Sequence, residues 1–250
     1  MTSVAASAGR LLPRGWGDLA RQLVIWFGFI LGYQVARGLA DRNPAQAFEN
    51  GLKVMDLERN AGALFELTLQ QVVNGSQLLT TLMSWTYWLS QFAVLGLALL
   101  WVYLRRNSAF TRFRNVILLA NAFGLVGYIL LPTAPPRMFW DAGFVDTLAL
   151  SGSLNHGSGF VELASNPYAA MPSLHAADAL LVGLIMASVV RRAFFKVAWL
   201  LWPAWVWLSV MATANHFWLD IVAGLGVAFL AALVVYRQPL RRRAPAPASP

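Results

Sequence analysis

The chain has 250 residues, of which 58% are hydrophobic and only 12% are charged, and its mean hydropathy is +0.56. Soluble domains carry about twice this share of charged residues, so the composition excludes an ordinary soluble protein, and it is too hydrophobic for a disordered one. The lack of cysteine excludes disulfides and thiolate chemistry. A polytopic membrane protein remains, and the net charge of +8 must then be explained by where the charges lie.

Five or six stretches approach the roughly 20 apolar residues that a membrane-spanning helix needs. In chain order they cover residues 22–39, 82–104, 116–131, 174–190, 197–214 and 217–236. The very short connection between the last two predicts a tight hairpin. We therefore expect an all-α protein, a bundle of six transmembrane helices in one domain over 22–236. It should lie between a cytoplasmic segment, 1–21, and a disordered cytoplasmic tail, 237–250.

Two long connections interrupt the apolar stretches. Residues 41–81 are too polar to span a membrane, and their pattern predicts interfacial helices on which Glu58, Arg59 and Glu66 form a solvated face. Residues 133–171 are rich in Pro, Gly, Ser and Asn, and a loop of this length is usually functional or disordered. We expect His156, in its Gly/Ser-rich part, to be solvated.

The basic residues alternate with the predicted spans. If the N-terminus is cytoplasmic, 14 of the 19 basic residues fall on the inner segments and eight of the 11 acids on the outer ones. This asymmetry follows the positive-inside rule, so it predicts that both termini are cytoplasmic and both long connections are outside. It also removes nucleic acid as the favoured explanation of the positive charge.

Polar residues that suit catalysis gather at the predicted outer ends of spans. His175 begins the fourth span, His216 precedes the sixth, and Arg137 follows the third. Asp220 lies four residues after His216, which on a helix places the carboxylate on the same face as the imidazole. A carboxylate bonded to one ring nitrogen makes the other a better nucleophile or base, and Arg137 offers a cation to a phosphate.

Each of these residues also has a simpler interpretation. A single histidine at a membrane interface is more often a packing or hydrogen-bonding residue, but an acid such as Asp220 beside an apolar span is costly and points to function. Asp178, three residues after His175, either tunes that histidine or bonds to another helix. Asn215 either contacts phosphate or, as we prefer, caps the last span.

The chain resembles the type 2 phosphatidic acid phosphatase superfamily in two of that family's three motifs. Residues 172–175 read Pro-Ser-Leu-His where the family has Pro-Ser-Gly-His. Ser209, His216 and Asp220 have the spacing of the third motif, with Val210 in place of its Arg. The first motif is Lys, six residues, then Arg-Pro. Here only its Arg is present, as Arg137, since Leu130 and Met138 stand at the Lys and Pro positions. The Pro-Ser-Leu-His form and the Pro-rich segment before Arg137 are more similar to the inositol phosphorylceramide synthase-like branch.

The resemblance implies a mechanism and a site. His216 would attack phosphorus to form a phosphohistidine, and Asp220 would orient it. His175 would protonate the leaving oxygen and then activate water or an alcohol, while Ser173 and Arg137 would hold the phosphoryl oxygens. No cofactor and no metal is expected, because cationic side chains neutralise the developing charge. Arg59, Lys53 and Arg42 are the candidates to replace the missing motif cations.

The predicted function is phosphoryl-ester cleavage on a phosphorylated lipid at the outer membrane face, with release to water or transfer to an alcohol. The rival hypothesis is a non-enzymatic protein that binds or transports lipid on a degenerate phosphatase fold. The sequence shows no internal repeat of the kind that transporters have, which favours the enzyme. It leaves open the lipid, the acceptor and the oligomeric state.

Overall fold

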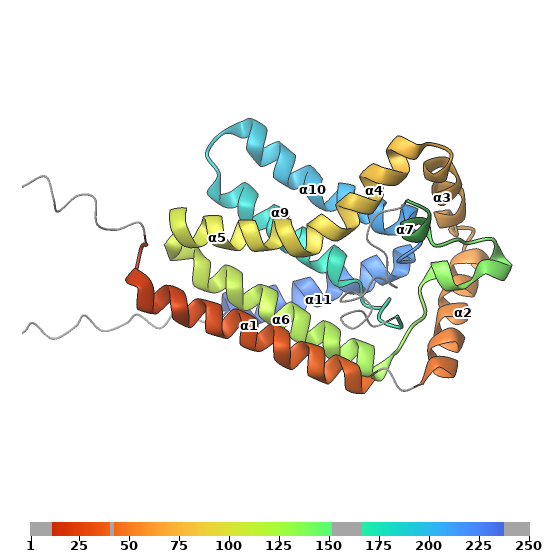
Figure 1. The fold of residues 1–250 in the computed structure, drawn as a ribbon, viewed down its shortest axis with the longest axis horizontal. Helices are drawn as coiled ribbons and strands as arrows, with labels where there is room; N and C mark the ends of the chain where they lie inside the picture. The colour runs from red at the N-terminus through yellow and green to blue at the C-terminus, as the bar shows by residue number, and fades with distance from the viewer. Residues whose placement is uncertain (1–11, 41–42, 152–166, 238–250) are drawn as a thin grey trace, which may run out of the picture.

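The computed structural model describes residues 12–40, 43–151 and 167–237. His156, Arg42 and the predicted tail beyond Arg237 lie outside the described residues. The long helices are α1 (Gly15–Ala40), α4 (Gln77–Leu89), α5 (Leu95–Arg105), α6 (Asn107–Leu130), α9 (Leu174–Val189), α10 (Ala193–Ala212) and α11 (Trp218–Arg237). A π-helical segment, Ser90–Val94, joins α4 to α5 into one continuous span (Figure 1).

The prediction of an all-α membrane protein is confirmed, but the count of six spans is not. Within the described ranges, five helical stretches are long and apolar enough to cross a membrane: α1, α4 to α5, α6, α10 and α11. The predicted fourth span, α9, has 16 residues and is too short by the same measure. The remaining boundaries differ most at α6, which begins at Asn107 and so includes Arg112 and Arg114 in its first turns.

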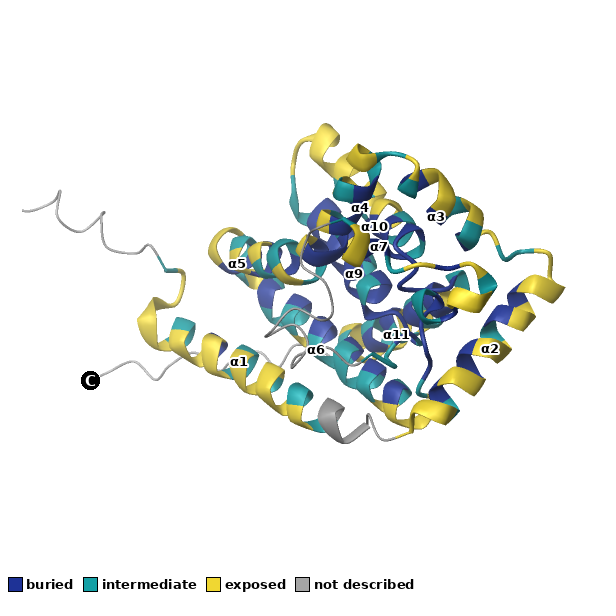
Figure 2. Ribbon diagram, turned by 45° about the vertical axis from the view of Figure 1, so that its right-hand side comes forward, coloured by how far each residue is buried: buried dark blue, intermediate teal, exposed yellow. Residues whose placement is uncertain are grey.

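The central helix of the bundle is α9, which packs against α5, α6, α10 and α11. A helix that is apolar all round has to be buried among others, and 11 of its residues are buried (Figure 2). Gly183 lets α10 approach closely, since a Cβ there would lie 2.6 Å from the Trp199 carbonyl oxygen and 2.8 Å from Pro203. Helix α1, by contrast, contacts α6 and leaves most of its surface exposed.

Short helices cover one end of the bundle. Helices α2 (Pro44–Asn60) and α3 (Glu66–Asn74) precede the second span. The segment after α6 forms two 3-10 turns, Pro136–Met138 and Trp140–Ala142, and then α7 (Thr147–Leu150). Helix α2 is amphipathic, and its buried Gly51 lies so close to the Ala134 carbonyl oxygen that an added Cβ would approach it to 2.7 Å.

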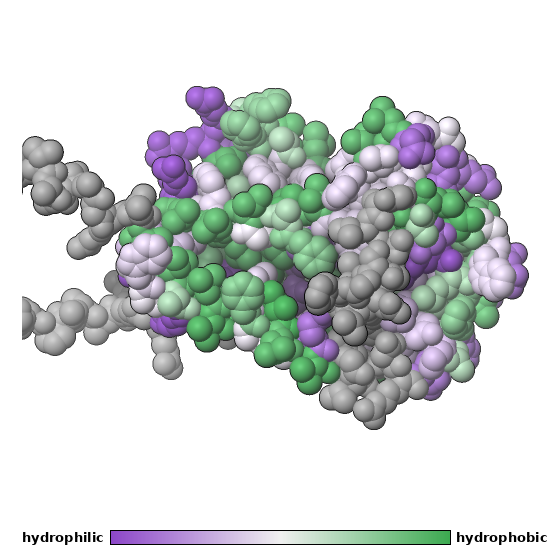
Figure 3. Space-filling model, in the orientation of Figure 1, coloured by the Kyte–Doolittle hydropathy of each residue, from purple (hydrophilic) through white to green (hydrophobic). Residues whose placement is uncertain are grey.

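The opposite end of the bundle carries most of the positive charge. The start of α1, the end of α11 and the α5–α6 and α9–α10 junctions all lie at this end, away from α2 and α3 (Figure 1). Hydrophobic side chains cover most of the middle of the visible face, and hydrophilic ones gather toward the two ends (Figure 3). The basic residues of these segments are Arg14, Arg21, Arg105, Arg106, Arg112, Arg114, Arg191, Arg192, Lys196 and Arg237.

Candidate active site

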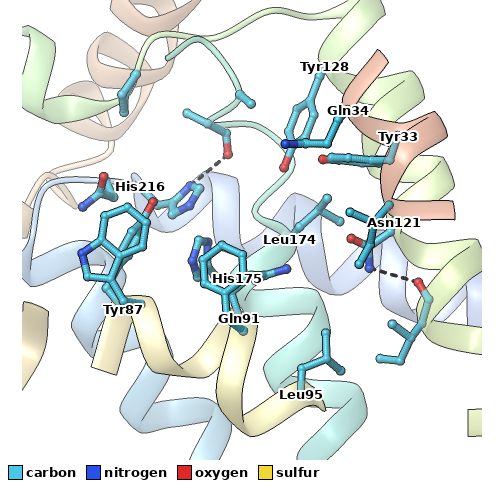
Figure 4. A pocket seen from close by; sticks show the side chains of 18 of the residues that line it. Tyr33, Gln34, Tyr87, Gln91, Leu95, Asn121, Tyr128, Leu174, His175 and His216 are labelled. Atoms are coloured by element: carbon cyan, nitrogen blue, oxygen red, sulfur yellow. Dashed lines mark hydrogen bonds between the residues drawn. The ribbon is translucent and has the colours of Figure 1, made fainter. Parts of the chain in front are cut away.

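A cavity of about 500 Å³ opens between α1, the π-helical segment, α6 and the start of α9. His175, His216, Arg137 and Asn215 line one part of it. Aromatic and aliphatic side chains from α1, the π-helical segment and α5 line another: Trp26, Phe29, Ile30, Phe92 and Leu95. Tyr33, Gln34 and Tyr128 lie across the cavity from His216 (Figure 4). The volume and the mixed lining are typical of a site for a small amphipathic molecule.

Three chain segments meet at the polar part of the cavity and are joined by backbone hydrogen bonds. The segment after α6 runs beside the one before α9: Thr133 N–H donates to the Tyr168 carbonyl at 2.8 Å, and Ala170 N–H donates to the Thr133 carbonyl at 3.1 Å. Arg137 N–H donates to the Ala214 carbonyl at 2.8 Å. The loops after α6, before α9 and after α10 are therefore held together.

His216 is held as a neutral imidazole with one nitrogen engaged. Its ring is buried, and Nδ1 lies 2.9 Å from the Ala170 carbonyl oxygen (Figure 4). A carbonyl can only accept, so this contact requires the proton on Nδ1 and leaves a lone pair on Nε2. Burial, reinforced by the positive charge of Arg137, lowers the pKa of His216 to about 3. An uncharged imidazole with a free Nε2 is a potential nucleophile.

The Asp220 carboxylate lies next to the same histidine. Its Oδ2 lies 3.5 Å from His216 Nδ1 and accepts the Phe217 N–H at 2.9 Å. The carboxylate is fully buried, and its Oδ1 has no hydrogen-bond partner. The sequence predicted that Asp220 orients the imidazole. In the structure the Ala170 carbonyl makes the shorter contact, and Asp220 anchors the backbone next to the ring.

His175 stands at the first turn of α9, facing His216. The centroids of the two rings are 5.8 Å apart, and His175 also stacks on Tyr87 with centroids 4.4 Å apart. Stacking on the tyrosine restricts the orientation of the His175 ring. The two imidazoles thus line the same cavity from different chain segments, His175 from α9 and His216 from the loop before α11.

Arg137 and Asn215 form a pair beside His216. Arg137 Nη1 donates to Asn215 Oδ1 at 2.6 Å, and Arg137 Nε lies 4.0 Å from an Asp146 carboxylate oxygen. The Asn215 amide in turn donates to Thr213. The preferred prediction from the sequence, that Asn215 caps α11, is wrong: its side chain bonds to Arg137 and Thr213 instead. It positions the guanidinium that lines the cavity.

The chain is similar to known proteins over most of its length. The sequence model of the PAP2 superfamily matches residues 52–234, which is most of the chain. The chain belongs to the PAP2 superfamily. It is also 27% identical over 139 residues to the phosphoinositol dihydroceramide synthase of Bacteroides thetaiotaomicron, across 50% of this chain and 45% of that protein. The chain thus matches less than half of that relative's length. No solved structure matches the chain.

Within this PAP2 fold, two further predicted residues have structural partners. Ser173 Oγ accepts the Ala176 N–H at 3.3 Å and so caps α9; the residue is buried and does not line the cavity. Asp178 bonds to other segments of the bundle. It accepts hydrogen bonds from Gln91 at 2.9 Å and from Asn121 at 3.0 Å, and thereby ties α9 to the π-helical segment and to α6.

Of the three proposed replacement cations, Arg59 and Lys53 do not line the cavity, and Arg42 lies outside the described residues. Arg59 forms an exposed ion pair with Asp56, and Lys53 forms one with Glu49. At the two PAP2 motif positions that lack a cation, Leu130 is exposed on α6 and Val210 is buried in α10. Among the described residues that line the cavity, Arg137 is the one cationic side chain.

The expectation that Glu58 and Glu66 form a solvated face is wrong. Both side chains are fully buried, because each accepts a backbone N–H at the start of α11. The sequence could not predict that these two acids accept N–H groups of α11. An acid on an amphipathic helix gives the same sequence pattern whether it faces water or the end of a neighbouring helix. Only Arg59, of the three, is on the exposed face.

Proposed function

We propose that this protein cleaves a phosphoric ester of a membrane lipid through a phosphohistidine on His216. His216 Nε2 attacks phosphorus, and the ester P–O bond breaks as His175 donates a proton to the leaving oxygen. His175 then takes a proton from water or from an acceptor alcohol, whose oxygen attacks phosphorus and releases His216. Arg137 offsets the charge on the phosphoryl oxygens, so the reaction needs no metal ion.

One observation carries this proposal: His216, His175 and Arg137 line the same cavity, with the His216 Nε2 lone pair left free by the Ala170 contact. The apolar lining of the cavity supports a lipid as the substrate, since it suits acyl chains while the polar part suits a phosphate. The name of the Bacteroides relative, a phosphoinositol dihydroceramide synthase, supports transfer to a lipid alcohol over hydrolysis.

We further propose that the site faces the outside of the cell membrane. The described arginine-rich segments lie at the end of the bundle opposite α2 and α3, and positively charged connections are retained on the cytoplasmic side. The cavity's polar residues are near the other end, beside the loops that hold Arg137 and Asn215. Both termini would then be cytoplasmic.

The test uses the full chain purified in detergent and a panel of lipid phosphates and phosphodiesters. Phosphate release and transfer to added lipid alcohols are measured for the wild type, His216→Ala and the control His156→Ala. We expect activity in the wild type and the control, at least 1,000-fold less in His216→Ala, as expected for the loss of a nucleophile, and no loss on adding a chelator. After quenching in base, in which a phosphohistidine survives, the wild type should carry labelled phosphate on nitrogen and His216→Ala should not.

The rival function, a lipid binder without turnover, has a specific observation in its favour: the cavity has a single cationic side chain among the described residues. Equal signals from the wild type and His216→Ala across the panel would support it and refute the enzyme. Binding of the same lipids, measured in parallel, would then report what the cavity holds.

A further inference from the structure

Three carboxylates cap the first turn of α11. The Phe217 N–H donates to Asp220 Oδ2 at 2.9 Å, the Trp218 N–H to Glu66 Oε1 at 2.7 Å and the Leu219 N–H to Glu58 Oε1 at 2.9 Å. The first N–H groups of a helix have no partner within the helix, and a single side chain at its start usually satisfies one of them. Here two of the three acceptors come from α2 and α3, more than 150 residues earlier.

Among the described residues, no lysine or arginine forms an ion pair with these carboxylates. Glu58, Glu66 and Asp220 are all fully buried, and the second oxygen of each has no hydrogen-bond partner. The basic residues of α2 that the structure describes, Lys53 and Arg59, form their ion pairs with other acids at the surface. The positive end of the α11 dipole and the three N–H groups are therefore the main stabilisation of this cluster.

Glu58 and Glu66 lie near each other within this cluster. They are close enough to hydrogen-bond once one is protonated, and burial together with the charges of Glu66 and Asp220 raises the pKa of Glu58 to about 8. Such a hydrogen bond would engage the two Oε2 atoms, which have no other partner. The opposite oxygens, Oε1 of each residue, remain acceptors for the Trp218 and Leu219 N–H groups.

The capped turn holds both histidine segments. His216 directly precedes Phe217, and its own N–H donates to the Val210 carbonyl at 3.1 Å, so its backbone is fixed between the end of α10 and the cap. The Ser173 N–H, two residues before His175, donates to the Asp220 carbonyl at 2.9 Å. Movement of this turn would therefore displace both imidazoles, and a displacement of about 1 Å at a reacting group can lower a rate about 100-fold.

We infer that Glu58 and Glu66 are positioning residues of the site: from α2 and α3 they hold the first turn of α11, and thereby His216, in place. This inference rests on the proposed function for its kinetic consequence. Its structural part, the cap, can be measured without turnover.

The structural test is amide hydrogen exchange on the full chain in detergent, read in the peptide that covers residues 214–221. We compare Glu58→Ala and Glu66→Ala with Glu58→Gln and Glu66→Gln, which keep an acceptor oxygen, and with Glu49→Ala, an exposed acid on the same helix. We expect exchange at least 10-fold faster in the alanine variants, within threefold of wild type in the others, and unchanged exchange in α6. Equal protection in the alanine variants would overturn the inference.

The kinetic test separates positioning from folding. Per folded molecule, the alanine variants should lose 10- to 100-fold in kcat with KM within threefold, and the glutamine variants should recover most of that loss. An unchanged kcat in the alanine variants would also overturn the inference. If an alanine variant does not fold, Glu58→Asp, one methylene shorter, takes its place. A wild type without activity refutes the proposed function, and hydrogen exchange then decides the cap alone.

Discussion

At the scale of single residues, the site depends on which atoms each side chain leaves free. His216 shows this best, because its Nδ1 contact with the Ala170 carbonyl determines the tautomer and exposes Nε2 to the cavity. A backbone carbonyl cannot become protonated in the physiological range, so this device works at any pH at which the fold persists. The carboxylate of Asp220 is then free to hold the Phe217 N–H.

The tautomer can be observed directly. Because burial and the Arg137 charge lower the pKa of His216 to about 3, we expect one histidine to remain neutral, protonated on Nδ1, from pH 5 to pH 8. The chain has only three histidines, so nitrogen spectra of histidine-labelled protein should resolve it. The signal should vanish in His216→Ala and persist in His156→Ala. A His216 signal that titrates near pH 6.5 would contradict the assignment.

Among the described residues, no other cationic side chain in the cavity could replace Arg137. Since no other described cation lines the cavity, Arg137→Ala should lower kcat/KM about 100- to 1,000-fold, in the range for loss of a preorganised donor. Arg137→Lys keeps the charge but not the planar fork that reaches Asn215, so we expect an intermediate loss. Arg59→Ala, which removes an exposed ion pair, is the control. Indistinguishable kinetics for Arg137→Ala and Arg59→Ala would exclude Arg137 from the site.

At the scale of elements, close contact between α11 and the start of α9 holds the two histidine segments together. An added Cβ at Gly224 would lie 2.2 Å from the Ser173 carbonyl oxygen, which is backbone and cannot rotate away. Glycine is therefore required here for approach, although its backbone is helical. The contact lies one turn beyond Asp220 and supports the Ser173–Asp220 hydrogen bond.

Gly224→Ala should accordingly separate α9 from α11. We expect it to lower the melting temperature and to reduce activity at least 10-fold even below the melting transition, because the His175–His216 geometry changes. Gly226→Ala is a matched control on the same helix, since nothing lies within 4 Å of a Cβ there. Equal stability and activity of the two variants would show that the contact tolerates a methyl group.

The carboxylate cap makes stability depend on pH in a defined direction. Burial, with the charges of Glu66 and Asp220, raises the pKa of Glu58 from 4.5 to about 8, so between these values the folded chain binds more protons than the unfolded chain. The free energy of unfolding should therefore fall as pH rises from about 4.5 to about 8. Glu58→Gln should flatten this dependence in thermal unfolding measured from pH 5 to pH 9. If the stability difference between the wild type and Glu58→Gln grew in favour of the wild type as pH rises, the predicted direction would be refuted.

At the scale of the whole molecule, the distribution of basic residues supports the proposed orientation in the membrane. The described basic segments gather at one end and the polar part of the cavity lies toward the other. Of the five described helical stretches that can span a membrane, all but α1 pack around the shorter α9, which is buried within the protein. A helix enclosed by others need not match the bilayer thickness, since its ends contact protein and loops.

Orientation can be tested cleanly because the chain has no cysteine. In intact cells, Trp140→Cys, in the exposed turn near Arg137, should react with a membrane-impermeant thiol reagent. Arg192→Cys, at the α9–α10 junction, should react only after the membrane is permeabilised. The reverse pattern would place the site on the cytoplasmic side and refute the proposed topology.

The amino-acid sequence was enough to predict an all-α membrane protein, its family and the candidate site residues His175, His216 and Arg137. The apolar stretches predicted the helices, because burying a backbone in lipid leaves few alternatives to a helix. The spacing of His216 and Asp220, and the Pro-Ser-Leu-His segment, sufficed for the family, since motif spacing is local. Both features can be identified without knowing which helices pack against each other.

Tertiary structure alone decided the partners of the polar groups. His216 Nδ1 contacts the Ala170 carbonyl, and Asn215 accepts a hydrogen bond from Arg137. Asp178 accepts hydrogen bonds from Gln91 and Asn121. The tertiary structure also moved Glu58 and Glu66 from an expected solvated face to the buried cap of α11. Such contacts join residues far apart in the chain, and no local pattern encodes them. They depend on which helix end lies against which side chain, and only the packed bundle fixes that.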